Sequence, residues 1–132
     1  MLTTDPALMP VIQPHLANAA APAIALVLQA PGSVTNIDAT ALAINMSCIR
    51  ELVPLLLHGG ALPALFSRLE HTNDVYVAKL IRALSEHRES HDVLEKYAMR
   101  IAEMVLRGEN PEVRMEALGI FANTPLKKVR TE

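Results

Sequence analysis

The sequence predicts an all-α fold, a helical solenoid with about three repeats and eight to nine helices. Its 132 residues are 51% hydrophobic but only 3% aromatic, and there is no Trp. A core of Ala, Leu, Ile, Val and Met suits helix-on-helix packing better than a β-sandwich. Signals that end one helix and begin the next recur along the chain, and related strings return about 40 residues apart.

The clearest of these signals is the stretch Gly59-Gly60-Ala61-Leu62-Pro63, which lies between two apolar runs. Glycine adopts the left-handed conformation that ends a helix without steric cost. Proline in the first turn of a helix loses no hydrogen bond, because that N–H has no partner inside the helix. One helix therefore ends here and another begins at an angle to it, which is typical of a corner in a helical repeat.

The same rules divide the whole chain into helices. Three prolines preclude one continuous helix over residues 1–14, so we expect an irregular lead-in there with at most a short helix. Thr35 or Asn36 is placed to cap a helix, and Pro54 predicts a kink or break in the run that contains it. The helices expected are Ala17–Ala21, Ala21 or Pro22 to Gln29, Ile37–Ser47, Cys48–His58, Leu62–Glu70, Asp74–His87, Asp92–Ala98, Met99–Arg107 and Pro111–Ala122.

Three of the longer helices end in related strings. Asn45, Ala83 and Asn123 hold matching places in them, 38 and 40 residues apart, and Pro22 and Pro63 precede the first two at similar distances. A period near 40 with two or three helices per unit is typical of a helical solenoid. We therefore expect a single domain, or a fragment of a longer array, made of a lead-in (1–15), three repeats (16–47, 48–87 and 88–124) and a tail (125–132).

The string GALPAL, followed by an apolar helix, a polar turn and a long helix ending in Asn, resembles an armadillo repeat. The closer resemblance is to the kinesin-associated protein family, the armadillo subunit of heterotrimeric kinesin. It covers roughly residues 22–124, in the family's order and at nearly its spacing, with Ala83 in place of the repeat's Asn. The matching pieces are Ile37-Asp38, Ile44-Asn45-Met46-Ser47, Gly60-Ala61-Leu62-Pro63, Leu80-Ile81-Arg82-Ala83-Leu84-Ser85-Glu86-His87 and Leu118-Gly119-Ile120-Phe121-Ala122-Asn123.

The resemblance implies an armadillo-like right-handed helical solenoid that acts as a non-catalytic protein–protein interaction scaffold. Its partner would be a kinesin motor tail or the cargo that the motor carries, in the cytoplasm and at the cytoskeleton or in cilia or flagella. Two alternatives stay open. One is a general armadillo adaptor that binds an extended peptide unrelated to kinesin, and the other is a structural subunit that uses its end face.

In an armadillo solenoid the third helices line a concave groove, and the resemblance implies that the recurrent Asn holds the backbone of an extended peptide. Residues four and seven positions before each motif residue share its helix face. The resulting face is Asp38, Ala41, Asn45, Tyr76, Lys79, Ala83, Glu116, Gly119 and Asn123, and its candidate partner-binding residues are Asp38, Asn45, Tyr76, Lys79, Glu116 and Asn123. The alternative is that these are ordinary solvated helix faces, with the two asparagines capping helix ends.

Other chemistry finds little support in the sequence. There is no Gly-rich phosphate loop and no nucleophile elbow, so we expect no catalysis and no cofactor. His87 and His91 stand four residues apart, but a third zinc ligand is not evident, and we expect a solvated turn without a metal. Cys48 has apolar neighbours and is expected to be a buried small hydrophobe.

The charge pattern does not favour nucleic acid, because the net charge is −2, the basic residues are dispersed and there are only four aromatic residues. The basic string Lys127-Lys128-Val129-Arg130 favours a solubilising tail over a contact with an acidic partner.

Residues 16–30 are nearly all apolar and carry no charge. A signal peptide would need a basic region ahead of them, yet the first Lys or Arg of the chain is Arg50. A stretch of this length broken by Pro22 is also too short to cross a bilayer. We expect a buried helix pair in a soluble, intracellular protein with no membrane insertion. Terminal solenoid units need polar caps, so we also expect self-association or partner docking through residues 16–30.

Overall fold

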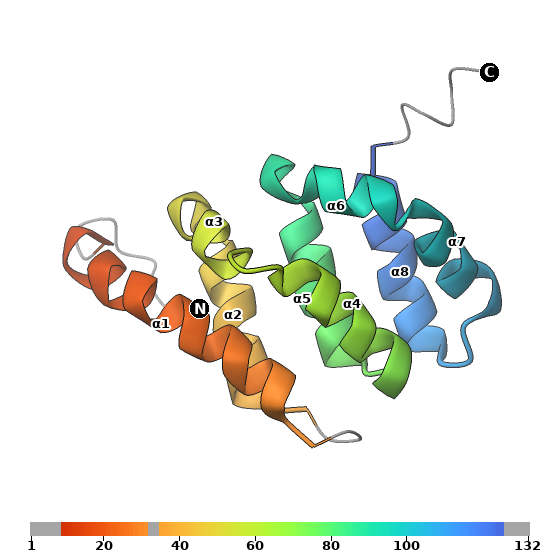
Figure 1. The fold of residues 1–132 in the computed structure, drawn as a ribbon, viewed down its shortest axis with the longest axis horizontal. Helices are drawn as coiled ribbons and strands as arrows, with labels where there is room; N and C mark the ends of the chain where they lie inside the picture. The colour runs from red at the N-terminus through yellow and green to blue at the C-terminus, as the bar shows by residue number, and fades with distance from the viewer. Residues whose placement is uncertain (1–8, 32–34, 126–132) are drawn as a thin grey trace.

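The computed structural model describes residues 9–31 and 35–125, and this part of the chain is helical with connecting turns and no strand. The all-α prediction is confirmed. Figure 1 shows the helices following one another from α1 to α8 across the molecule. They are α1 (Met9–Gln29), α2 (Ile37–Ser47), η2 (Arg50–Leu52), α3 (Val53–Leu56), α4 (Ala61–Thr72), α5 (Val75–Ser85), η3 (Arg88–Ser90), α6 (His91–Lys96), α7 (Ala98–Arg107) and α8 (Pro111–Asn123).

Three helices of similar length form a row. α5 packs against α2 on one side and against α8 on the other, while α1, α4 and α7 form a second layer over them (Figure 1). The row helices begin alike, at Asn36, Asp74 and Asn110, which are 38 and 36 residues apart. Each of these side chains accepts a hydrogen bond from a backbone N–H of the first turn, as an N-cap does. The arrangement is that of a helical solenoid.

The connection after each of the first two row helices also repeats. Ile49 (φ −102°) and His87 (φ −105°) are extended, and each is followed by a short 3-10 helix, η2 or η3. The chain turns by 117° between Ile37–Ser47 and Arg50–Leu56. The repeat is therefore present in the backbone conformation as well as in the sequence.

Backbone conformation explains the corner before α4. Gly59 and Gly60 have φ values of 72° and 75°, in the left-handed region that glycine occupies at little cost. Gly60 is the N-cap residue of α4, and Pro63 lies in its first turn. At the other end of α4, Asn73 is also left-handed (φ 55°), and its N–H donates to the carbonyl of Leu69.

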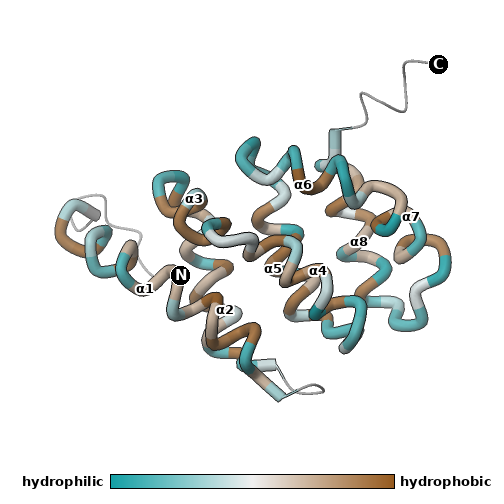
Figure 2. Tube along the Cα trace, viewed as in Figure 1, coloured by the Kyte–Doolittle hydropathy of each residue, from teal (hydrophilic) through white to brown (hydrophobic). Residues whose placement is uncertain are grey.

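The core is mainly aliphatic and runs through the stack. Figure 2 shows hydrophobic and hydrophilic stretches alternating along the helices, as expected when one side of each helix is buried. The largest buried side chain is Phe66 of α4, whose ring stacks on Tyr97 at a centroid distance of 4.5 Å. The buried aliphatic residues of the row helices are Ala39, Ala43, Met46, Val77, Ala78, Leu80, Ile81, Leu84, Val113, Ala117 and Ile120.

The predicted break within residues 16–30 is wrong. Residues 9–29 form the single helix α1, with Pro14 and Pro22 inside it. Both prolines are exposed, as are Pro10 and Asn18, whose carbonyls lose their helical partners. Water can hydrogen-bond to these carbonyls, so the helix continues past both prolines.

Residues 16–30 would be too short to cross a bilayer if Pro22 broke them. Since α1 is continuous, its length no longer argues against a membrane span. By length and composition Pro10–Gln29 meets the criterion for a membrane-crossing helix, as core helices of soluble proteins and signal sequences also do, and 28% of it is buried. Its buried side chains are Leu16, Ala20, Ala23, Ile24 and Val27, and α1 packs against α2, α3 and α4.

The run Cys48–His58 contains the break predicted near Pro54, since η2 ends at Leu52 and α3 begins at Val53. The helix does not begin at Cys48, because Ile49 is extended, and Pro54 lies in the first turn of α3. The prediction that Cys48 is buried is wrong. Cys48 itself is exposed, since it is the residue that ends α2 and its side chain lies outside the packed face. The tail string Lys127–Arg130 lies outside the described residues.

Candidate protein-binding face

The nine residues selected from the sequence lie on the three helices of the row, and we call them the row face. Each is at least partly accessible, and none is buried. On α2, Asp38 and Ala41 are exposed and Asn45 is half-buried. The other members are Tyr76 and Lys79, which are exposed, and Ala83, Glu116, Gly119 and Asn123, which are half-buried.

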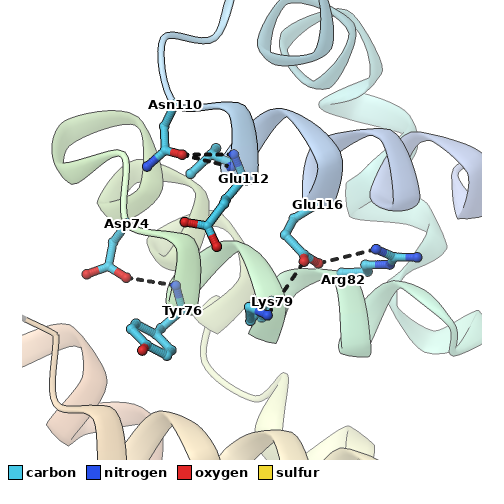
Figure 3. A network of polar contacts seen from close by, with 8 residues as sticks. Asp74, Tyr76, Lys79, Arg82, Asn110, Glu112 and Glu116 are labelled. Atoms are coloured by element: carbon cyan, nitrogen blue, oxygen red, sulfur yellow. Dashed lines mark hydrogen bonds and ion pairs between the residues drawn. The ribbon is translucent and has the colours of Figure 1, made fainter.

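Glu116 of α8 draws two cations of α5 toward it, as Figure 3 shows. Its Oε2 lies 3.8 Å from Lys79 Nζ, and its Oε1 lies 3.4 Å from Arg82 Nη1. The Glu116 side chain is 16% exposed, whereas those of Lys79 and Arg82 are 46% exposed. The carboxylate is therefore held between the helices, while the cations remain in contact with water, where each pair is worth at most about 1 kcal/mol.

Gly119 makes room for this arrangement. A Cβ atom at this position would overlap the Arg82 side chain around its Nε, so the guanidinium lies directly over the α8 backbone. One turn further along α8, Asn123 Nδ2 donates to Ser85 Oγ at 2.9 Å. Three polar contacts thus join α5 to α8, at Glu116 twice and at Asn123.

The other half of the row face has no such contacts. Among the described residues, no side-chain hydrogen bond or ion pair joins α2 to α5, and these helices meet through aliphatic side chains. The side chains of Asp38 and Asn45 have no polar partner within the described part of the chain. Tyr76, on the neighbouring helix α5, is 40% exposed. These groups remain available to a ligand.

The family model described as Kinesin-associated protein (KAP) matches residues 16–131. The chain belongs to the kinesin-associated protein family. The match includes all three helices of the row and every residue of the row face. No solved structure matches the chain.

The structure brings some of the predicted residues together and leaves the side chains of Asp38 and Asn45 without a polar partner among the described residues. Lys79 and Glu116 form an ion pair, but Asn123 is engaged with Ser85 and is not simply a helix cap. Sequence reasoning missed Arg82 and Ser85. Arg82 stands three positions after Lys79 on the same helix, and this spacing could have identified it.

The remaining sequence candidates do not assemble into a site. His87 precedes η3 and His91 opens α6, and within residues 9–31 and 35–125 no three His, Cys, Asp or Glu side chains are grouped to hold a metal. A surface cavity of about 420 Å³ lies between α4 and α7, away from the row face. Its charged residues include Glu70 and Arg100, whose Oε2 and Nε lie 3.4 Å apart.

Proposed function

We propose that this member of the family is a non-catalytic scaffold that joins a kinesin motor tail to its cargo, in the cytoplasm at the cytoskeleton or in cilia or flagella. The observation that supports it is the row face, where three stacked helices of a family member present small and polar side chains to solvent. An extended segment crossing α2, α5 and α8 would meet hydrogen-bonding groups at each step. We assign partner binding to Asp38, Asn45, Tyr76, Lys79, Glu116 and Asn123.

These six residues would contribute differently. Asn45 has an uncommitted carboxamide, which can both donate to and accept from a peptide backbone. Tyr76 offers an exposed ring on which an apolar side chain can pack. Glu116 and Asn123 already have partners on α5, so besides binding the partner they also set the spacing of α5 and α8. Direct contact therefore falls mainly to α2 and α5.

The test is a pull-down of a heterodimeric kinesin tail by this chain, with a charge-matched unrelated segment as control. Replacing Asn45 and Tyr76 together by Ala should weaken binding by about 1–3 kcal/mol if partner groups lose their hydrogen bonds. Ser67→Ala changes an exposed polar residue of α4, outside the row face and outside residues 16–30, and should leave binding unchanged. Tail enrichment no greater than that of the control segment would contradict the motor-tail assignment. It would leave a general armadillo adaptor as the alternative.

A structural role for an end face is the second candidate, because large apolar side chains are exposed at the α7–α8 end. Met99, Leu106 and Met115 are 77%, 73% and 63% exposed. Apolar surface of this kind is typical of protein contacts. At the opposite end α1 carries no charge, and its Leu26 is 49% exposed, which supports self-association through residues 16–30. Light scattering at rising protein concentration tests this self-association. If the chain stayed monomeric at every concentration, and Leu26→Asp did not change the measured mass, the self-association would be contradicted.

A further inference from the structure

A contact between α4 and α7 shows which side of a layer helix faces the next unit. Glu70 Oε2 of α4 lies 3.4 Å from Arg100 Nε of α7. The caps Asp74 and Asn110 give these two units a spacing of 36 residues, which places Leu106 of α7 where α4 has Glu70. Leu106 is 73% exposed. α7 therefore turns an apolar side chain outward at a position that joins two units inside the chain.

The row helices give the same result. Lys79 and Arg82 of α5 both reach forward to Glu116 of α8. With the same spacing of 36 residues, α8 has Met115 and Leu118 in their places, and these are 63% and 49% exposed. The positions that join α5 to α8 through charge are therefore apolar and exposed on α8. We call the three exposed residues at this end the leading face: Leu106, Met115 and Leu118.

α1 turns apolar side chains toward the opposite end of the stack. Buried residues of α1 and α4 follow the same spacing, 42 residues apart: Ala20, Ala23, Ile24 and Val27 on α1, and Leu62, Leu65, Phe66 and Leu69 on α4. Leu26 therefore takes the place of Arg68, which reaches back from α4 to carbonyls at the end of α1. Leu26 is 49% exposed. The two spacings together give Pro22, which is also exposed, the place of Arg100.

In the row, the matching position lies on α2. Glu116 stands six residues after the cap Asn110, and Leu42 stands six residues after the cap Asn36. Glu116 faces α5, the preceding row helix. Because equivalent residues of a solenoid face the same way, the half-buried Leu42 lies on the side of α2 away from α5. We call the residues at this end the trailing face: Pro22, Leu26 and Leu42.

We propose that copies of this chain stack head to tail, with the leading face of one copy on the trailing face of the next. Figure 1 shows α1 and α2 at the opposite end of the molecule from α7 and α8. When the internal contacts are shifted by one unit, Leu106 meets Pro22 and Leu26 in the layer. In the row, Met115 and Leu118 meet Leu42. The internal ion pairs are thus replaced by contacts between apolar side chains.

The same match identifies a second copy as the occupant of the leading face. Solenoids that remain single carry polar residues on the outer faces of their end units, whereas these positions are apolar. The inference rests on the second candidate function, self-association through residues 16–30, and names the surface that these residues meet. Because the two faces differ, each added copy leaves one free face of each kind, so assembly continues beyond a dimer.

Light scattering of the full 132-residue chain at rising concentration should give an average mass above twice that of the monomer. Leu106→Asp with Leu118→Asp blocks the leading face, and Leu26→Asp blocks the trailing face, so each variant alone should be monomeric. An equal mixture of the two retains one intact pair of faces and should form a dimer that does not grow. Leu55→Asp changes a comparably exposed Leu (42%) on α3, which belongs to neither face, and should assemble like the unaltered chain.

A monomer at every concentration would overturn the head-to-tail inference. A dimer formed by the variant with a blocked leading face would also overturn it, because two trailing faces would then pair with each other. Self-association through residues 16–30 would stand in that case. Pull-down of the motor tail by the monomeric variants tests the scaffold role separately, because Leu26, Leu106 and Leu118 lie outside the row face.

Cross-linking provides a second measurement that places no charge in the contact. In a Cys48→Ser background, Leu26→Cys is made in one sample of the chain and Leu106→Cys in another. A bismaleimide should cross-link a mixture of the two and neither sample alone, and cross-linking of either sample alone would contradict the head-to-tail arrangement. Thermal unfolding of each variant confirms that it is folded before assembly is compared.

Discussion

Arg68 is a residue on which the attachment of α1 depends. It lies on α4, and its Nη1 donates to the carbonyl of Ala30 at 2.6 Å and of Leu28 at 3.5 Å, while Nη2 donates to Pro31 at 2.8 Å. α1 has no basic residue in its last turn. The carbonyls at its end are therefore satisfied by a guanidinium from the following repeat, which also complements the helix dipole.

The two short contacts set the size of the effect. A hydrogen bond from a charged donor contributes about 1.5–3 kcal/mol, and the lower value applies here because the site is only partly buried and water can replace the donor. Arg68→Ala should therefore lower the free energy of unfolding by about 3 kcal/mol. For a domain of this size that corresponds to a fall in Tm of about 10 °C. Arg68→Lys keeps the positive charge but not the two-pronged guanidinium, and should lower the free energy of unfolding by about half as much as Arg68→Ala.

Urea unfolding followed by circular dichroism measures this change, and hydrogen exchange of the backbone amides of residues 23–30 locates it. Exchange there should rise in Arg68→Ala more than exchange in α8. Arg107→Ala is the control, because its partner Glu103 and Arg107 itself are largely exposed and such pairs contribute less than about 1 kcal/mol. If Arg68→Ala matched this control, the guanidinium would not anchor α1 and the reasoning would be refuted.

Three further predictions concern stability. Gly59→Ala should cost about 1–2 kcal/mol in urea unfolding, purely from the left-handed backbone, since no atom lies within 4 Å of the added methyl group. Gly119→Ala should change stability by less than about 1 kcal/mol, because gained helix propensity offsets displacement of Arg82. In an Arg82→Ala background the same change should stabilise, and the double-mutant cycle checks this. Asn123→Ala should cost about 1 kcal/mol through its bond to Ser85, while Asn45→Ala should not lower Tm.

Local signals were sufficient for much of the fold. The caps Asn36 and Asn110, the glycine corner and the aliphatic periodicity of α5 act over a few residues, so they can be recognised in the sequence. The continuity of α1 could not be recognised in this way, because it depends on which side of the helix the prolines face. The exposure of Cys48 likewise depends on a turn whose geometry is set by packing.

The row face shows the same division. Its members could be selected by helical spacing, since residues three and four apart share a side. The partners of those members could not be predicted, because they depend on how α5 and α8 are positioned against each other when they pack. Asn123 thereby meets Ser85, and the Arg82 side chain lies over Gly119, where the sequence had placed Ala83 level with Asn123.

These contacts divide the row face into two unequal parts. The α5–α8 half is fixed by Glu116 and Asn123, so a ligand that used these groups would first have to break bonds that already exist. The α2–α5 half is held by aliphatic packing alone, and Asn45 and Asp38 there can bind a partner without that cost. Replacing Glu116 by Gln tests this division, since it releases Lys79 and Arg82. It should shift peptide preference toward acidic segments and leave contacts at Asn45 intact.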